Sequence, residues 1–270
     1  MSIGSFLLLV LGGGVAGTIG AMLGLGGGVF LTPFLLFVFG LPMHQAIATS
    51  ILAVIATSSA GAAMNMERQT VNIRLGMVLE IATVTGAIFG GITANLLSGD
   101  VLSHIFATLL LVVAFTMIWR LKHSSDTAPA VTDGAFAAAY KDEATGAMIP
   151  YSAKRIPAVL VVSLIAGNIS GLLGVGGGIF KVPAMHLISG IPMKAATATS
   201  NFMIGVTAAA SAFVYFAHGH LNPFVVAPAV LGVLGGSFLG VKVNRHIKGS
   251  FLTWIFAGVL LVVAVRMFWK

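Results

Sequence analysis

Two glycine triplets in an apolar chain are the residues best suited to bind a ligand. They are Gly26–Gly28 and Gly176–Gly178, and a proline, Pro33 or Pro183, follows each of them five residues later. Glycine adopts positive φ and lets the backbone approach a ligand closely, so each triplet predicts a break between helices. The helix after each break would present the unpaired N–H groups of its first turn, which attract anions. The alternative is that the glycines serve close helix packing.

Hydroxyl and amide side chains follow each triplet at the same distance. They are Thr49 and Ser50 after the first triplet, and Thr199, Ser200 and Asn201 after the second. Hydroxyls and amides donate hydrogen bonds to oxyanions where water is excluded. We expect them to complete an anion site with the glycines. Helix capping or bonding to the preceding turn is the alternative.

A lysine and a glutamate lie within apolar stretches, each in one half of the chain. Lys181 follows the second triplet by three residues, where the first copy of the pattern has Leu31. A lysine inside a membrane costs about 2.5–3.5 kcal/mol on insertion scales, so it requires a partner or a function. We expect Lys181 to face an anionic substrate; an ion pair with Glu80 or snorkelling is the alternative. Glu80, where the second copy has Val230, is expected to pair with Lys181 or to carry a coupling proton.

No other chemistry is indicated by the sequence. The chain has no cysteine, and its seven histidines, among them His44, His104 and His186, lack the spacing of metal ligands. A Ser–His–Asp set and a nucleotide-binding loop are both missing. We therefore expect no enzyme activity, no metal and no cofactor. The net charge of +7 is scattered over short loops, so we expect no nucleic-acid partner. Nothing in the sequence indicates an oligomeric state.

The elements that position these residues are duplicated. Residues 17–50 match residues 167–200 at 16 of 34 positions without a gap. We divide the chain into a first repeat (1–120) and a second repeat (151–270), joined by a linker (121–150) without apolar periodicity. The linker is expected to be flexible and cytoplasmic, with at most one helical turn near its residues 135–141.

The composition places both repeats in a membrane. The chain is 58% hydrophobic and 8% charged, with a mean hydropathy of +1.05, whereas a soluble domain carries about 25% charged residues. The apolar stretches are continuous rather than alternating, so helices are expected and a β-barrel is not. The fold class is therefore an all-α polytopic membrane protein. The apolar segments of the first repeat are 5–23, 29–41, 45–65, 75–97 and 101–119.

The basic residues predict that the two repeats are inverted. Lys and Arg mark cytoplasmic loops, and they occupy the 66–74 loop of the first repeat but the 242–249 loop of the second. The same loop therefore lies on opposite sides of the membrane, with the linker inside and both termini outside. Inversion requires an odd number of crossings per repeat: either five, or three with the first two segments forming a hairpin. We expect the glycine-broken helices near the midplane.

The doubled motif resembles that of the sulfite exporter TauE/SafE family of membrane permeases. Its elements are the triplet, the proline, a Gly-apolar-Pro-Met segment beginning at Gly40 or Gly190, and an Ala-Thr-Ser segment. The resemblance implies a prokaryotic inner-membrane carrier of sulfite, sulfoacetate or related organosulfonates. It also implies roles for the motif residues Gly26–Gly28, Pro33, Thr49, Ser50, Gly176–Gly178, Pro183, Thr199 and Ser200.

These inferences lead to a secondary transporter of a small oxyanion. The substrate would bind between the repeats, which would then rock to alternate access. Because no ATP-binding motif is present, an ion gradient or the substrate gradient would drive transport, and export of an anion would need no coupling ion. The alternatives are an anion channel and a membrane subunit without transport of its own.

Overall fold

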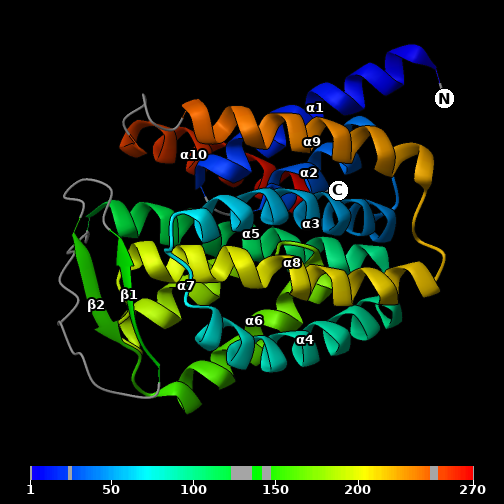
Figure 1. Ribbon diagram of the computed structural model, residues 1–270. Helices are drawn as coiled ribbons and strands as arrows, with labels where there is room; N and C mark the ends of the chain where they lie inside the picture. The colour runs from blue at the N-terminus through cyan, green and yellow to red at the C-terminus, as the bar shows by residue number, and fades with distance from the viewer. Residues whose placement is uncertain (1, 24–25, 123–135, 142–146, 244–248, 270) are drawn as a thin grey trace.

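The computed structural model describes residues 2–23, 26–122, 136–141, 147–243 and 249–269, which form ten helices and one β-hairpin (Figure 1). The first repeat contains α1 (Ile3–Leu23), α2 (Gly28–Val38), α3 (Met43–Glu67), α4 (Ile73–Leu96) and α5 (Gly99–Lys122). The second contains α6 (Ile156–Leu173), α7 (Gly178–Leu187), α8 (Met193–Ala217), α9 (Pro223–Val243) and α10 (Gly249–Phe268). The apolar segments expected from the sequence are confirmed as helices.

The helices form a bundle with an apolar outer surface. Seven of them are long and apolar enough to cross a membrane, while α2 and the described part of α10 (256–268) are shorter. Large apolar side chains such as Phe115, Phe213 and Val262 are at least 70% exposed, which in a bundle of this composition is the surface expected to face lipid. The chain is a multi-pass membrane protein.

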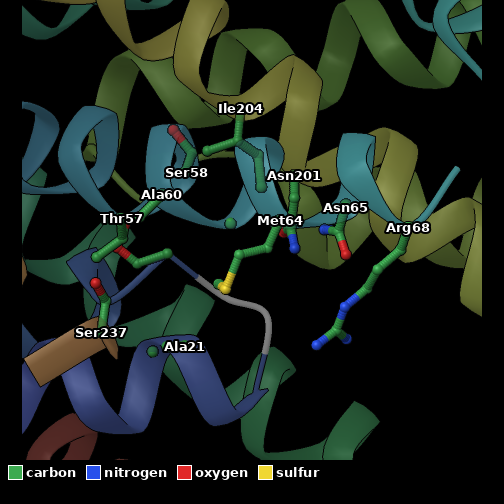
Figure 2. A pocket seen from close by; sticks show the side chains of 13 residues that line it. Ala21, Thr57, Ser58, Ala60, Met64, Asn65, Arg68, Asn201, Ile204 and Ser237 are labelled. Carbon is green, nitrogen blue, oxygen red and sulfur yellow. The ribbon is translucent and has the colours of Figure 1, made fainter. Parts of the chain in front are cut away.

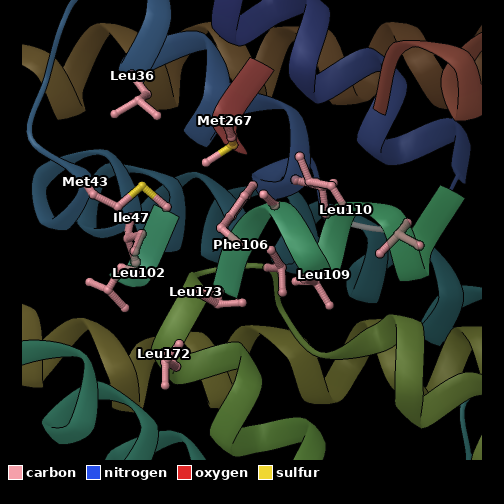
Figure 3. Packing of buried hydrophobic residues seen from close by; sticks show 14 of the residues in the cluster. Leu36, Met43, Ile47, Leu102, Phe106, Leu109, Leu110, Leu172, Leu173 and Met267 are labelled. Carbon is pink, nitrogen blue, oxygen red and sulfur yellow. The ribbon is translucent and has the colours of Figure 1, made fainter. Parts of the chain in front are cut away.

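A buried apolar cluster fills the centre of the bundle. It joins α3, α5, α8 and α10, and it includes residues from both repeats. Figure 3 shows Phe106 of α5 between Met267 of α10 and Leu173 of α6. The halves therefore share one core rather than forming two separate ones.

Equivalent helices of the two repeats make equivalent contacts. The α1 helix packs along α9, and α6, which corresponds to α1, packs along α4, which corresponds to α9. Glycines allow this close approach, because a Cβ at Gly17 would strike the Val233 carbonyl and one at Gly167 would strike the Thr83 carbonyl. The α3 and α8 helices pair with each other, as do α5 and α10. This exchange of partners is the contact pattern of an internal two-fold.

Equivalent helices run in opposite directions. Figure 1 shows α3 running toward the side of the β-hairpin and α8 running away from it. Two contacts agree with this view. At the start of α3, His44 stacks on His220, which follows α8, with ring centroids 4.9 Å apart. At the other end, the Asn72 side-chain amide, between α3 and α4, donates to the Phe136 carbonyl beside the hairpin at 3.4 Å.

Each short helix folds back along the helix before it. A Cβ added at Gly12 of α1 would meet the Phe34 ring of α2, and one at Gly20 would meet the backbone of Gly27. The α2 helix therefore returns along α1, and α7 packs on α6 in the same way. These contacts are those of the hairpin considered from the sequence.

Part of the linker forms two strands. The β1 strand (Ala137–Lys141) pairs antiparallel with β2 (Met148–Ser152). The helical turn expected near residues 135–141 is wrong, because Ala137–Lys141 extend and pair instead. The aromatic rings of Tyr140 and Tyr151 lie buried in one cluster with Leu75 of α4 and Val182 of α7, and this contact stabilises the extended pairing of the two short strands.

Candidate functional site

A polar cavity lies between α3 of the first repeat and α8 of the second. Figure 2 shows Asn201 and Ile204 reaching it from α8 and Ser237 from α9, with α1 opposite α3. Its volume is about 150 Å³, and a cavity needs only about 10–15 Å³ by this measure to hold one water. It therefore has room for a small polyatomic ion. Its walls are Gly20, Ala21, Gly26, Thr57, Ser58, Ala60, Gly61, Met64, Asn65, Arg68, Asn201, Ile204 and Ser237.

The cavity wall favours an anion over a cation. The amides of Asn65 and Asn201 supply hydrogen-bond donors. The hydroxyls of Thr57, Ser58 and Ser237 already donate to the carbonyls of Gly26, Ile55 and Leu234. Arg68, at the end of α3, is the one charged side chain among these wall residues, and guanidinium groups match planar and tetrahedral oxyanions well. No wall residue carries a carboxylate.

Both glycine triplets break helices as the sequence predicts. Gly26, Gly27, Gly176 and Gly177 have φ between 67° and 78°, a region that other residues rarely enter. The α2 and α7 helices begin at the third glycine of each triplet, and their N-caps form no side-chain hydrogen bond. Each helix start therefore presents first-turn N–H groups that its own cap does not satisfy.

The two triplets converge at the middle of the bundle. The Ser50 hydroxyl lies 3.2 Å from the Gly28 carbonyl and 3.1 Å from the Gly174 carbonyl, so it is placed to donate to either repeat. A Cβ at Gly28 would also strike the Gly174 carbonyl. The Val54 side chain touches the Cβ positions of both Gly26 and Gly176. The glycines thus approach one another, and Gly26 lies in the cavity wall.

The first triplet is fastened to α3 by a threonine. Thr57 donates a hydrogen bond of 2.9 Å to the Gly26 carbonyl and lies within 3.1 Å of the Val54 carbonyl. This contact orients the backbone of the break beside the cavity. Thr57 was not singled out from the sequence.

Lys181 does not lie in the cavity wall. It is 1% exposed and donates a hydrogen bond of 3.3 Å to the Thr207 hydroxyl. Thr207 in turn donates to Oε1 of Glu80 at 2.6 Å, while Thr83 donates to Oε2 at 2.9 Å. The structure therefore joins Lys181 and Glu80 through one hydroxyl, whereas the alternative to substrate contact was a direct ion pair between them.

The remaining candidate residues lie outside the cavity wall. The Thr199 hydroxyl accepts a hydrogen bond of 3.0 Å from the Asn72 backbone N–H, at the start of α4, so it supports the helix junction. Thr49 is buried, and the Ser200 hydroxyl has no partner among the described residues. Pro33 lies inside α2 and Pro183 inside α7, five residues after each break. Of the expected residues, Gly26 and Asn201 line the cavity.

The cavity residues of α3 that were not predicted lie on one face of the helix, and the helical period of the sequence could have identified them. Starting from Ser50, the positions one and two turns later on the same face of α3 are Val54, Thr57 and Ser58, and Gly61 and Asn65 follow. Reading this face onward from Ser50 leads directly along the cavity wall. Arg68 was interpreted as a topology determinant alone.

Comparison with known proteins finds relatives along nearly the whole chain. A family model described as Sulfite exporter TauE/SafE matches residues 9–267. The chain is 27% identical to "Probable membrane transporter protein YunE" of Bacillus subtilis, over 98% of both chains. It is 25% identical to a "Probable membrane transporter protein" of Xylella fastidiosa, over 100% of this chain and 97% of the relative. No solved structure matches the chain significantly.

Proposed function

This chain belongs to the sulfite exporter TauE/SafE family. We propose that it is a secondary transporter of a small sulfur-containing oxyanion. Sulfite or an organosulfonate is the substrate class, and export across the inner membrane of a prokaryote is the physiological direction. The observation that carries the proposal is the cavity between α3 and α8, which combines the amide donors of Asn65 and Asn201 with Arg68 and has no carboxylate among its described wall residues.

The substrate binds in this cavity rather than beside Lys181. Asn201 and Asn65 donate to the anion from opposite repeats, and Thr57 holds the Gly26 backbone beside it. Buried donors of this kind replace the hydration shell of an oxyanion, which would otherwise make entry into the bilayer costly. Contacts from both repeats make the site sensitive to their relative movement.

The two repeats are inverted, and their exchange of conformation alternates access. The opposite directions of α3 and α8 and the exchanged partners of α1 and α6 support this arrangement. The equivalent place in the second repeat is occupied differently. In the second repeat, the equivalent of Asn65 is Tyr215, which is fully buried and donates to the Leu172 carbonyl at 3.1 Å. Opening at Tyr215 and closing at Asn65 would expose the site to the other side.

The cavity faces the cytoplasm in this state. Arg68 lies in the cavity wall, and the loop that follows it reaches the hairpin of the basic linker through Asn72 and Phe136, so the rule that basic loops stay inside applies to this end. With the cell interior negative by about 100 mV, each negative charge that leaves gains roughly 2.3 kcal/mol. An inward-facing anion site is therefore suited to export.

Counterflow of radiolabelled sulfite in proteoliposomes tests this function. Vesicles loaded with unlabelled sulfite should accumulate external label transiently and saturably. The variant Asn201→Ile, which copies the equivalent residue Ile51, should reduce the initial rate at least tenfold. The matched control Thr93→Val, whose exposed hydroxyl bonds only within its own helix, should leave the rate unchanged.

The other outcomes identify the alternatives. A flux that rises linearly with sulfite concentration, without counterflow, would indicate an anion channel. Absence of any flux for sulfite and sulfonates would indicate a subunit that does not transport alone. A normal rate for Asn201→Ile would place the substrate elsewhere.

A further inference from the structure

Thr57 and Thr207 occupy equivalent positions but make different hydrogen bonds. Thr57 donates to the Gly26 carbonyl of the first triplet at 2.9 Å. The equivalent acceptor for Thr207 would be Gly176 of the second triplet. Thr207 instead donates to the Glu80 carboxylate at 2.6 Å, and its hydroxyl also lies 3.0 Å from the Met203 carbonyl of its own helix. The Glu80 carboxylate therefore accepts from Thr207, whose equivalent in the first repeat, Thr57, donates to the glycine break.

The charged pair is not needed for packing at this place in the fold. The residues at the equivalent positions are Leu31 of α2 and Val230 of α9, so the place related by the repeat has two apolar side chains instead of a charged pair. Breaking a buried ion pair is costly, and keeping one commonly gives no more stability than an apolar pair. An ionisable pair confined to one of two equivalent sites therefore calls for a functional reason.

The pair lies next to the candidate substrate cavity. Ile204 is a wall residue, and Thr207 follows it on the same face of α8, which places Thr207 about 4.5 Å further along the helix axis. Thr207 is also the equivalent of the wall residue Thr57. A state in which the second repeat opened as the first does here would bring Thr207 to the cavity wall.

We propose that Glu80 binds a proton that is carried together with the anion, and that Thr207 transmits its arrival to the second glycine triplet. This inference rests on the proposed transport function. The proton enters from water, adds to a Glu80 carboxylate oxygen, and leaves to water on the opposite side, so no other reactant is required.

The Thr207 hydroxyl can donate to only one acceptor at a time, and the protonation of Glu80 determines which one. A threonine hydroxyl has one hydrogen, and the carboxylate takes it while Glu80 is ionised. A protonated Glu80 can donate its own hydrogen to the Thr207 oxygen, which frees the Thr207 hydrogen for a backbone carbonyl. Thr207 can then fasten the Gly176 segment as Thr57 fastens Gly26.

Charge balance links the proton to the anion. With Glu80 ionised and Lys181 charged, the buried pair is neutral, so it adds nothing to the attraction that Arg68 of the cavity wall exerts on an anion. Protonation of Glu80 leaves Lys181 unbalanced, and one negative charge on the substrate restores neutrality. Because uncompensated buried charge is costly, the two ligands favour each other's binding, and this coupling is reciprocal. For a monovalent anion this coupled step moves no net charge, so the proton and anion gradients, and not the membrane potential, set the direction of net flux. Export then requires an outward anion gradient larger than the inward proton gradient.

Few other ionisable groups approach this pair. The α6 helix, which packs along α4, contains no ionisable side chain. On α8 the ionisable residues Lys194 and Tyr215 lie more than two turns from Thr207, and on α7 His186 lies more than one turn beyond Lys181. Within α4 itself Arg74 lies more than one turn before Glu80. Glu80 is therefore the group whose replacement should remove the coupling.

Proteoliposomes measured in two modes test the inference. Counterflow of radiolabelled sulfite at equal pH on both sides needs no net proton movement. Accumulation driven by an imposed pH gradient, acidic outside, does need it. Protein-free vesicles correct for the passive entry of neutral sulfur dioxide. The wild-type chain should perform both reactions, and a trapped pH dye should report acidification during sulfite entry.

The variant Glu80→Gln should retain counterflow within about twofold and lose gradient-driven accumulation at least tenfold. The double variant Glu80→Val with Lys181→Leu, which copies the first repeat, should fold and should also lose the gradient response. The control Glu67→Gln, at an exposed carboxylate, should retain both. Two results would overturn the proton site and leave the transport proposal standing. One is gradient-driven accumulation by Glu80→Gln, and the other is a wild-type protein with normal counterflow but without gradient-driven accumulation. Absence of counterflow in the wild type would instead overturn the transport proposal.

Discussion

The Ser50 hydroxyl, in the first repeat, lies 3.1 Å from the Gly174 carbonyl, in the second. It also lies 3.2 Å from the Gly28 carbonyl, so a single buried side chain contacts both glycine breaks. The equivalent residue in the second repeat, Ser200, has no hydrogen-bond partner among the described residues. The residue equivalent to Gly174 in the first repeat is residue 24, which lies outside the described residues. The contact between the two breaks is therefore made by α3, the helix that also forms the cavity wall.

Replacing Ser50 should weaken the junction between the repeats. Ser50→Ala leaves two buried carbonyls without this donor, which costs about 1–2 kcal/mol. The thermal unfolding midpoint in detergent should fall by about 2–8 °C. The control Ser103→Ala removes only a hydrogen bond to Gly99 within its own helix and should change the midpoint by less than about 2 °C. Equal effects of the two substitutions would argue against the bridging role.

The close approach at Gly28 predicts a steric effect of one methyl group. Gly28→Ala would place Cβ against the Gly174 carbonyl and 2.7 Å from the Ser50 hydroxyl. The variant should unfold at a lower temperature than the wild type and should lose sulfite counterflow. Gly235→Ala is the matched control, because nothing lies within 4 Å of its Cβ position; it should be neutral or slightly stabilising, since alanine favours helix. A functional Gly28→Ala protein would contradict the close packing of the two breaks.

Inversion of the repeats predicts opposite labelling of equivalent positions. Glu67 and Ala217, at the ends of α3 and α8, are both exposed and are related by the repeat. The chain contains no cysteine, so single variants Glu67→Cys and Ala217→Cys can be modified with a membrane-impermeant thiol reagent. Position 217 should react in intact cells, and position 67 only after the membrane is opened. Reaction of both from the same side would rule out the inverted arrangement.

Acid should destabilise the face of the bundle that carries His220. Burial and the neighbouring His44 and His218 lower the pKa of His220 below its usual 6.5, and its Nε2 lies 2.7 Å from Asn95 Oδ1. The unfolded chain therefore binds the proton more readily, so stability is retained above about pH 6.5 and falls as the pH drops below it. Between pH 7 and pH 5, the unfolding midpoint should fall further in the wild type than in His220→Gln. Parallel curves for the two proteins would refute this assignment.

The repeat made much of the fold predictable from the sequence. The two glycine triplets at Gly26 and Gly176 carried the prediction of broken helices, because glycine alone adopts the required φ at low cost. Continuous apolar runs identified the long helices, since lipid leaves few other ways to pair the backbone. The strand at Ala137–Lys141 was missed because its alanines favour helix, and only the burial of Tyr140 and Tyr151 in the tertiary structure reveals why it extends.

The residues that line the candidate cavity were predicted in part for a similar reason. Gly26 and Asn201 were found because they belong to, or follow, the duplicated motif. The bridge between Lys181 and Glu80 depends on Thr207, which is distant from Glu80 in the sequence and has a hydroxyl like many others in the chain. Arg68 was used only to predict which loops are cytoplasmic, so its place in the cavity wall was not predicted. The places of these side chains depend on contacts between α3 and α8, and such contacts cannot be derived from sequence periodicity.

Anomalous diffraction from crystals soaked with selenite, a heavier analogue of sulfite, tests the central claim most directly. The account predicts a selenium peak inside the cavity walled by Thr57, Asn65 and Asn201, and the loss of that peak in Asn201→Ile. A peak beside Lys181 alone, a peak in the pocket near His104 at the opposite face, or an empty cavity at saturating selenite would contradict it.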